Sequence, residues 1–324
     1  MFGRTILATT IFAALACMHS VIGAPLPDAP PPAAPPATSG AGGVPQPPHF
    51  VVYNDRGPDP APDPSAVAGF NVVAMSFMLS TGPADMALTW QQLPAAQRQT
   101  IKASYEKAGI KLVVSAFGST ELPTTSGKDP KALASTMAQW VKDNDVDGID
   151  VDYEDLQAMS ANDGKAEQWL VDFTTALRAE LPQGQYILTH APLAPWFSKT
   201  TYKSGAYLTV DKQVGSMIDW YNVQFYNQGA TEYTDCNGLL NQSKAFPGTS
   251  VFEIGAAGIP LNKIVIGKPG ATSDASNGYI DPLHLRNAWQ RLRASNGVNA
   301  GVMSWQYPNA NAQWISTVKG SAFK

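Results

Sequence analysis

The sequence is poor in the residues that mark several common classes of protein. Charged side chains occupy 15% of the 324 positions, and a formal net charge of −4 leaves no basic surplus to neutralise phosphates. No run of like charges forms a polybasic patch for a membrane surface. The two cysteines and four histidines are scattered, whereas a structural zinc site needs ligands at short spacing. We therefore expect no nucleic-acid partner, no membrane attachment and no metal site.

The hydrophobic residues, 44% of the chain, are too interrupted for a multi-span membrane protein. Residues 1–24 contain one charge, Arg4, followed by an apolar run that ends at Cys17 and by small residues. This order is typical of a secretory signal peptide, and the run is too short to span a bilayer. We expect a secreted, extracellular protein. Loss of this segment would leave Cys236 as the single cysteine, so the mature chain would have no internal disulfide.

Residues 25–48 are rich in proline, holding ten of the 26 prolines without any apolar period. Such a segment favours extended polyproline geometry and cannot bury a core. The sequence thus predicts a disordered linker or pro-segment here, followed by one folded domain over residues 49–324.

Short runs rich in Val, Ile, Phe and Tyr recur through this domain and are typical of buried strands. The expected strands are Phe50–Tyr53, Asn71–Ser76, Lys111–Ala116, Gly148–Tyr153, Tyr186–His190, Tyr221–Phe225, Ile264–Gly267 and Gly301–Trp305. Between them, helices are expected at Ala95–Ala108, Pro130–Lys142, Lys165–Leu181 and Pro282–Ala294. Strands that alternate with helices pair in parallel, and eight such units fit the roughly 250 residues of a (β/α)8 barrel.

An open, doubly wound sheet is the alternative architecture. In that fold a glycine-rich turn follows the first strand, but here the residues after that strand read NDRGPDPAPD. The sequence therefore favours the barrel.

The fourth expected strand carries the sequence DGIDVDYE over residues 147–154. Alternate side chains of a strand face opposite ways, so Asp150, Asp152 and Glu154 share one face, about 6.5–7 Å apart in succession. In a barrel the apolar side chains of the other face pack under the helices, and these three point inward. Like charges in a confined site raise at least one pKa, and a carboxyl group kept protonated near neutrality suits a general acid.

Glu154 lies at the C-terminal end of this strand, where barrel active sites are built, so we predict that it is the proton donor. A solvated acidic edge or a calcium site is the alternative interpretation. A calcium loop would carry its oxygens on a turn with a central glycine rather than on a β-branched strand. The chain also lacks the G-x-S-x-G and H-E-x-x-H motifs of other hydrolytic chemistries.

These acidic residues resemble the D-x-x-D-x-D-x-E pattern of glycoside hydrolase family 18, the chitinase and endo-β-N-acetylglucosaminidase family. The resemblance extends over about residues 49–324. The sequence QFYN at residues 224–227 resembles the family's sixth strand, and Trp305 stands where the family places the tryptophan beneath the sugar. The sequence SAFG at residues 115–118 resembles the family's S-x-G-G with Phe117 in place of a glycine. We expect this departure to narrow the cleft or to change which chain enters it.

The resemblance implies a retaining mechanism that is assisted by the substrate and needs no metal or organic cofactor. Glu154 would protonate the leaving glycosidic oxygen and later act as base, while the acetamido carbonyl of the sugar attacks the anomeric carbon. Asp152 would orient that acetamido group, Asp150 would share a proton with Asp152, and Tyr226 would hydrogen-bond the acetamido oxygen. The expected substrate contacts are Trp305, Gln224, Asn227, Ser115, Asp147 and, with a direction that the sequence leaves open, Tyr53.

Three functions remain open at this point. The leading one is a chitinase that cleaves β-1,4-linked N-acetylglucosamine chains. The second is an endo-β-N-acetylglucosaminidase that cuts the chitobiose core of N-glycans, which the single glycine of the SAFG segment mildly favours. A carbohydrate-binding lectin without turnover is the third, and the presence of Glu154 speaks against it. In each case we expect a monomer whose partner is a polysaccharide or glycan of this type.

Two further side chains near the expected cleft have more than one interpretation. His190 ends the fifth expected strand, and a buried core histidine is favoured over a cleft residue. Trp196 follows the same strand on the catalytic side and is a candidate for stacking on a sugar.

Overall fold

The computed structural model describes residues 43–296 and 300–320. The expected signal peptide and most of the proline-rich segment therefore lie outside the described residues. At the start of the described chain, Val44 is partly buried and packs against the core. The first strand begins at His49, where the folded domain is expected to begin.

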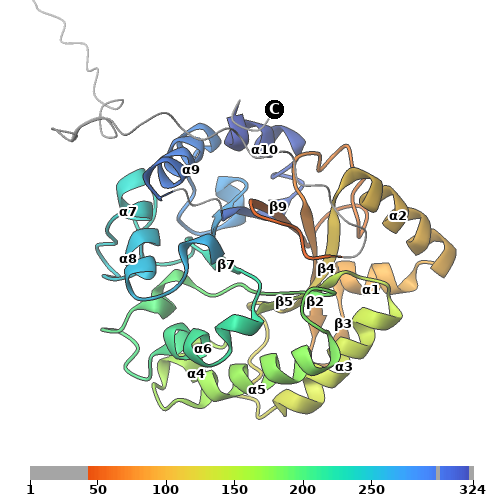
Figure 1. The fold of residues 1–324 in the computed structure, drawn as a ribbon, viewed down its shortest axis with the longest axis horizontal. Coiled ribbons are helices and arrows are strands. Elements are labelled where there is room, and N and C mark those ends of the chain that lie inside the picture. Colours follow the sequence, from red (N-terminus) through yellow and green to blue (C-terminus); the bar gives the residue numbers. More distant parts are fainter. Residues whose placement is uncertain (1–42, 297–299, 321–324) are drawn as a thin grey trace, which may run out of the picture. The chain divides into compact units, whose positions relative to one another are not determined.

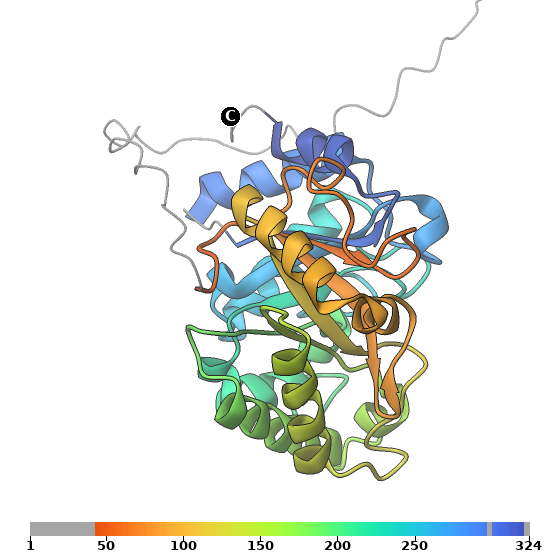
Figure 2. The same ribbon diagram turned by 90° about the vertical axis from the view of Figure 1, so that its right-hand side faces the viewer.

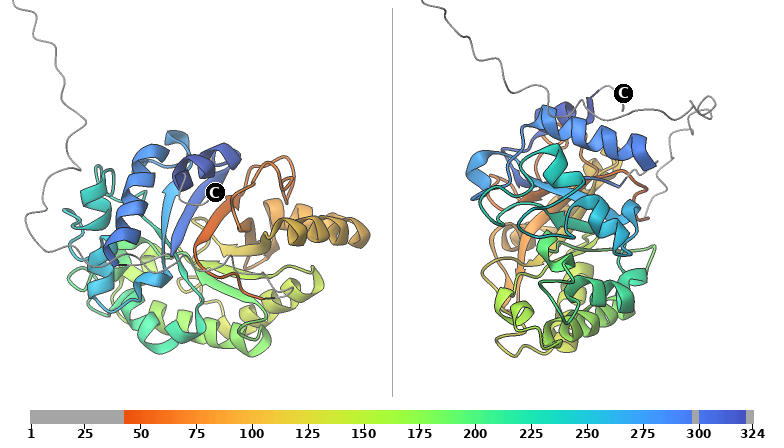
Figure 3. Two further views of the ribbon diagram at one scale, coloured as in Figure 1. Left: turned by 45° about the horizontal axis from the view of Figure 1, so that its top comes forward. Right: turned by 90° about the vertical axis from the view of Figure 1, so that its left-hand side faces the viewer.

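Eight parallel strands form a closed ring, with helices around it (Figure 1). They are β1 (His49–Asn54), β2 (Val72–Leu79), β4 (Lys111–Phe117), β5 (Gly148–Asp152), β6 (Ile187–His190), β7 (Tyr221–Gln224), β8 (Ile264–Pro269) and β9 (Gly301–Tyr307). The ring closes because β1 pairs in parallel with both β2 and β9. Figure 3 shows β1, in orange-red, beside β9, in blue. The (β/α)8 barrel is confirmed, and the open sheet is wrong.

The strand β3 (Gly82–Pro83) was not expected from the sequence. It pairs antiparallel with the end of β2, joining Leu79 to Gly82. Gly82 has a φ of +125°, which few residues other than glycine adopt, so it allows the chain to turn back here. Two residues are too short to show any hydrophobic period, which explains why this hairpin escaped the sequence patterns.

Ten α-helices are found in the part of the chain that the structure describes, and α2 runs alongside the strands (Figure 2). They are α1 (Asp85–Gln92), α2 (Ala95–Ala108), α3 (Pro130–Asp143), α4 (Leu156–Ser160), α5 (Lys165–Glu180), α6 (Ala206–Val214), α7 (Cys236–Leu240), α8 (Val251–Ala256), α9 (Pro282–Asn296) and α10 (Ala312–Lys319). The four expected helices are confirmed to within two residues at each end. Within the described ranges no helix combines the length and apolarity needed to cross a membrane.

Local signals explain where two of these helices begin and end. The side chain of Asp129 accepts a hydrogen bond of 2.9 Å from the backbone N–H of Ala132, which caps the start of α3. Gly109 follows α2 with a φ of +70° and donates its N–H to the last turn, which ends that helix.

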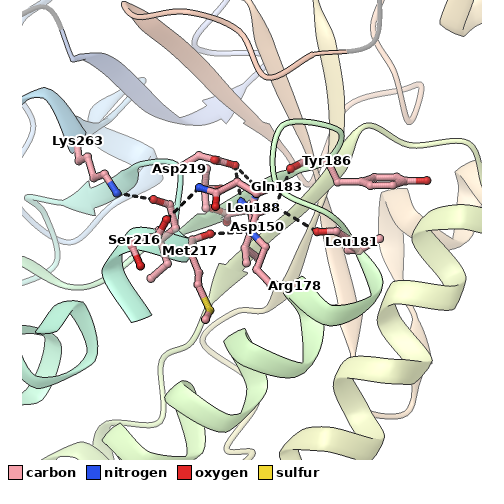
Figure 4. Close-up of polar contacts among 12 residues, drawn as sticks. Asp150, Arg178, Leu181, Gln183, Tyr186, Leu188, Ser216, Met217, Asp219 and Lys263 are labelled. Carbon is pink, nitrogen blue, oxygen red and sulfur yellow. Dashed lines mark hydrogen bonds and ion pairs between the residues drawn. The ribbon is translucent and has the colours of Figure 1, made fainter. Parts of the chain in front are cut away.

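The N-terminal ends of β6, β7 and β8 are held by a network of one ion pair and several hydrogen bonds to the backbone (Figure 4). Arg178 Nη2 lies 2.8 Å from Asp219 Oδ2, and its Nε donates to the carbonyl of Met217 at 2.6 Å. The same Asp219 oxygen accepts the backbone N–H of Leu188 at 2.8 Å. Nearby, Lys263 Nζ donates to two backbone carbonyls at 2.7 Å each. Every acidic or basic group of this network thus has a partner that fixes a strand entry.

Candidate active site

Asp150 lies on β5, inside the barrel, and is fully buried. One of its oxygens, Oδ2, accepts hydrogen bonds from Tyr53 Oη of β1 at 2.7 Å and from Ser115 Oγ of β4 at 2.9 Å. The other, Oδ1, accepts from Thr189 Oγ1 of β6 at 2.6 Å and from Asn222 Nδ2 of β7 at 3.0 Å. Four different strands therefore converge on one carboxyl group.

Burial and hydrogen bonding act in opposite directions on the pKa of Asp150. Burial raises this pKa above its ordinary value, because a charge loses its water shell in the barrel interior. The four hydrogen bonds stabilise the carboxylate and lower the pKa, with the bond from Thr189 as the largest. The carboxyl group is thus fixed in place and keeps a raised affinity for a proton.

Gln224 of β7 connects the other two carboxyl groups of the acidic strand. Its Nε2 donates to Asp152 Oδ1 at 2.8 Å and lies 3.4 Å from Glu154 Oε1. The same nitrogen donates to the carbonyl of Ala191 at 2.9 Å, which fixes the amide against the end of β6. The amide therefore holds Asp152 and Glu154 next to each other.

The pKa values of this pair are both raised. Burial is the largest cause for each group, and the charges of Glu154 and Asp150 raise the pKa of Asp152 further, well above its ordinary value. A hydrogen bond between the two side chains raises the pKa of Asp152 and lowers that of Glu154. The two groups therefore share a proton through this hydrogen bond, and the pKa of each is raised above its ordinary value. A proton shared by two such groups, one of which is partly exposed, is suited to general acid–base chemistry.

Tyr226 and Trp305 complete the face around these carboxyl groups. Tyr226 is 4% exposed, and burial together with the charges of Asp152 and Glu154 raises the pKa of its phenol well above the ordinary value. Trp305 is partly exposed at the end of β9, with its ring centroid 5.8 Å from that of Tyr53 and 5.9 Å from that of Phe77. The Phe77 and Trp305 rings are stacked, so together they form an aromatic surface.

Gln306 fixes the edge of the Trp305 indole. With its amide oriented to satisfy its neighbours, Oε1 accepts from Trp305 Nε1 at 3.3 Å and from Arg56 Nη2 at 3.1 Å. The indole N–H of Trp305 is thus bonded, while the residue as a whole stays partly exposed.

Asp147 does not belong to this cluster, so its expected role as a substrate contact is wrong. It precedes β5 at the N-terminal end of the strand, where its Oδ2 accepts the backbone N–H of Leu112 at 2.7 Å and pairs with Lys102. Lys111 lies 4.0 Å from its other oxygen. The alternation of the strand explains the error, since Asp147 shares its parity with the outward-facing Ile149 rather than with Asp150.

Three other expected substrate contacts have partners within the protein. Tyr53, 2% exposed, and the fully buried Ser115 both donate to Asp150 and lie behind it. Asn227 is exposed beyond β7, where its Oδ1 accepts from the backbone N–H of Ser276 at 2.8 Å. Asn227 therefore links the loops that follow β7 and β8.

Phe117 points away from the cleft, so the expectation that it narrows the cleft is wrong. Its ring packs edge-on against Trp169 of α5 at 5.7 Å and against Phe173 at 5.3 Å between centroids. Trp196 is likewise fully buried and stacks on Tyr207 at 5.8 Å, which removes it as a sugar contact.

His190 is a core residue, as expected. It is fully buried, with Nδ1 3.1 Å from the hydroxyl of Tyr207 and Nε2 3.2 Å from that of Thr174, and burial lowers its pKa to about 3. The imidazole therefore stays neutral and does not take part in the cluster.

Three residues of the cluster were not anticipated: Thr189, Asn222 and Phe77. A signal for the first two exists, because each has the inward parity of its strand while an apolar or aromatic neighbour has the outward parity. Phe77 had no such signal, since it lies beyond the expected end of β2. Within the described ranges no group of three or more His, Cys, Asp or Glu side chains is arranged to hold a metal ion.

The closed barrel and its carboxyl pair, with Asp152 buried and Glu154 partly exposed, form a site suited to acid–base catalysis. A model of the family described as Glycosyl hydrolases family 18 matches residues 50–320, so the chain belongs to this family and is a glycoside hydrolase. A comparison with curated proteins finds no match.

Solved structures of the family resemble the chain over most of its length. A family 18 chitinase from Pseudoalteromonas aurantia is 26% identical with a TM-score of 0.68, covering 83% of this chain and 98% of its own. A putative chitinase A from Streptomyces coelicolor is 19% identical with a TM-score of 0.63, covering 83% and 96%. A fungal endo-β-N-acetylglucosaminidase of family 18 is 19% identical with a TM-score of 0.60, covering 84% and 96%. The last two likenesses concern the fold alone.

Proposed function

We propose that the enzyme cleaves β-1,4 bonds between N-acetylglucosamine units of chitin or chito-oligosaccharides with retention of configuration. The observation that carries this proposal is the pair Asp152 and Glu154, held side by side by Gln224 above the fully bonded Asp150. The 26% identity to a family 18 chitinase supports the choice of substrate. We further propose that the enzyme acts outside the cell, in line with the signal-like residues 1–24.

In this mechanism the proton that Asp152 and Glu154 share passes from Glu154 to the glycosidic oxygen, which leaves Asp152 as a carboxylate, and the bond from that oxygen to the anomeric carbon breaks. The acetamido carbonyl oxygen of the same sugar then bonds to the anomeric carbon and forms an oxazolinium ion, as in substrate-assisted hydrolases of this family. Asp152, which Gln224 holds beside Glu154, accepts the acetamido N–H and balances the developing positive charge. Water finally attacks the anomeric carbon and gives a proton to Glu154, while the bond from that carbon to the acetamido oxygen breaks and the acetamido group is restored.

The aromatic and phenolic groups would orient the sugar. Tyr226 would donate its hydroxyl to the acetamido oxygen, and its raised pKa keeps that proton in place at working pH. Trp305, steadied by Phe77 and Gln306, would lie beneath the sugar ring.

Cleavage of the N-glycan core is mildly favoured by the single glycine of the SAFG segment, where Phe117 stands in place of the other glycine. Phe117 packs against α5 rather than in the cleft, so this replacement offers no contact for an N-glycan. N-glycan cleavage is therefore kept as an outcome of the test rather than as a second proposal.

The test offers the purified enzyme chitopentaose and, separately, a high-mannose glycoprotein, with products read by mass. We expect short chito-oligosaccharides from the wild type and none from Glu154→Gln. Glycans released so that one N-acetylglucosamine stays on the protein would transfer the proposal to N-glycans. Binding of either sugar without cleavage would overturn it in favour of a lectin.

A further inference from the structure

Lys268 is a fully buried lysine on β8, close to the site but outside the acidic cluster. Its Nζ donates to three backbone carbonyls, of Phe225 at 2.7 Å, Tyr233 at 2.5 Å and Gly278 at 2.9 Å. An ammonium group has three N–H donors and no acceptor, so three carbonyls satisfy it completely. Burying a charge is costly unless it is bonded in this way. Burial lowers the pKa of Lys268 well below its ordinary value, and all three of the hydrogen bonds that hold its Nζ go to loop backbone.

The three carbonyls belong to two loops that frame the site. Phe225 and Tyr233 lie in the loop between β7 and α7, and Gly278 lies in the loop between β8 and α9. Lys268 bridges these loops from below, since its own strand, β8, is paired with β7. Phe225 is the residue directly before Tyr226, so the carbonyl that Lys268 binds belongs to the peptide unit that carries Tyr226.

The second loop packs directly on the backbone of Tyr226. Gly278 has a φ of +92°, and a Cβ placed there would lie 2.6 Å from the Cα of Tyr226. Hydrogen bonds join the same loops further along, from Asn227 N to the carbonyl of Asn277 at 3.2 Å and from Asn277 Nδ2 to the carbonyl of Gln228 at 2.6 Å. Tyr226 is thus clamped between β8 below and the Gly278 segment beside it.

We propose that Lys268 is a positioning residue that sets the orientation of Tyr226 by clamping the carbonyls of Phe225, Tyr233 and Gly278. The proposal rests on the function proposed above, in which Tyr226 binds the acetamido oxygen. The peptide plane before Tyr226 fixes the direction in which its long side chain leaves the backbone. A small rotation of that plane therefore displaces the hydroxyl, at the far end of the side chain, by a larger distance. Lys268 touches no substrate and acts only through this plane.

The experiment compares Lys268→Met and Tyr226→Phe, alone and combined, on chitopentaose. Methionine keeps the length of the side chain and removes all three donors. We expect kcat to fall by about 10–100-fold in Lys268→Met with KM changed less than about threefold, because misplacement of a group by about 1 Å can cost that much. In the Tyr226→Phe background the same substitution should reduce kcat less than about threefold, since the hydroxyl it positions is gone.

Lys263→Met is the matched control. This lysine also donates to backbone carbonyls, of Gly215 and Ile218 at 2.7 Å each, but it does so at the opposite end of the barrel (Figure 4). A purely structural role predicts that both lysine variants lose stability and leave kcat unchanged. An equal loss of kcat from Lys268→Met in both backgrounds would also overturn the proposal.

Two further measurements keep the proposal open to refutation. If Lys268→Met does not fold, Gly278→Ala pushes the same clamp against Tyr226 with the lysine intact, and its loss of kcat should again vanish in the Tyr226→Phe background. A crystal structure of either variant with the Tyr226 hydroxyl unmoved relative to Asp152 overturns the proposal whatever the substrate is. Failure of the wild type on both sugars would instead contradict the proposed function, and the crystal structure would still decide the role of Lys268.

Discussion

Acidic side chains lie at both ends of the barrel, but their partners differ. At the N-terminal ends of the strands, Asp219 is bonded to Arg178, and Asp147 is bonded to Lys102. At the C-terminal ends, Asp150 and Asp152 accept their hydrogen bonds from neutral hydroxyl and amide groups.

The difference in partners separates two uses of the same residue type. A cation stabilises a carboxylate and keeps it charged, which suits a structural bond at a strand entry. Neutral donors in a buried place leave the pKa raised, as for Asp152, so a proton can be held and passed on. Stability and chemistry therefore lie at opposite ends of the same strands, and four substitutions test this division.

Glu154→Gln should have the largest effect. Loss of a general acid lowers kcat by about 10²–10⁴-fold, while the fold and sugar binding survive. Glu180→Gln is the matched control, since that carboxyl is bonded to Lys142 at 2.9 Å, away from the site. The kcat of both variants is measured on chitopentaose. An unchanged kcat in Glu154→Gln would show that the carboxyl groups at the C-terminal end are not catalytic.

Arg178→Met should have the largest effect on stability. It leaves the Asp219 carboxylate, whose side chain is only 10% exposed, without its cation and the carbonyl of Met217 without its donor, which costs about 3–5 kcal/mol of unfolding free energy. Denaturant unfolding measures this loss, with Lys165→Met as a surface control that costs less than about 1 kcal/mol. The kcat of the folded variant should stay within about twofold of wild type. A large fall in kcat would mean that the two ends are not independent.

Phe117→Gly tests whether a side chain on the outer face of β4, at the catalytic end, contributes to stability and not to substrate choice. Phe117 has a φ of +79°, which costs a residue with a side chain about 1–2 kcal/mol, and glycine removes that cost. Loss of its buried ring costs about 3–5 kcal/mol, which is more than the backbone strain that is relieved. We therefore expect a net loss of about 2–3 kcal/mol of unfolding free energy. Thermal unfolding measures it. A changed substrate preference would contradict the outward orientation of the ring.

Asp152→Asn should have the smallest effect on stability, and the opposite sign. A carboxyl group whose pKa is raised in the folded state destabilises the protein progressively as the pH rises above the pKa of the unfolded chain. Asparagine has no proton to lose, so the variant should gain on the order of 1–2 kcal/mol over wild type near pH 8 and little near pH 4, while activity falls. Denaturant unfolding at the two pH values measures the difference in unfolding free energy between variant and wild type, with the exposed Asp163→Asn as control. A difference that is the same at both pH values would contradict the prediction.

The sequence was sufficient for the barrel because its signals are local. Each strand is a short apolar run, and the end of α2 at Gly109 or the cap of α3 at Asp129 depends on a few neighbouring residues. The acidic strand was equally legible, since the alternation of Asp150, Asp152 and Glu154 needs no distant residue.

The remainder of the site was less predictable because its contacts span the chain. Thr189 and Asn222 meet Asp150 through strand register alone, and the direction of Phe117 depends on how α5 packs against β4. The role of Lys268 depends on three carbonyls that are separated in sequence. No local sequence pattern predicts such long-range contacts.

The convergence of four strands on Asp150 also has a consequence for how the protein is made. The bonds to Asp150 come from β1, β4, β6 and β7, and Trp305 lies on β9. A ribosome-bound chain that has emerged only as far as β5 therefore has the acidic strand but not the rest of the site. Synthesis from Asp150 to Trp305 takes on the order of 10 s at ordinary translation rates. During that interval the nascent chain holds three unsheltered carboxylates and no means of cutting a sugar. Hydrolytic activity should therefore appear abruptly, with closure of the ring, rather than grow with chain length.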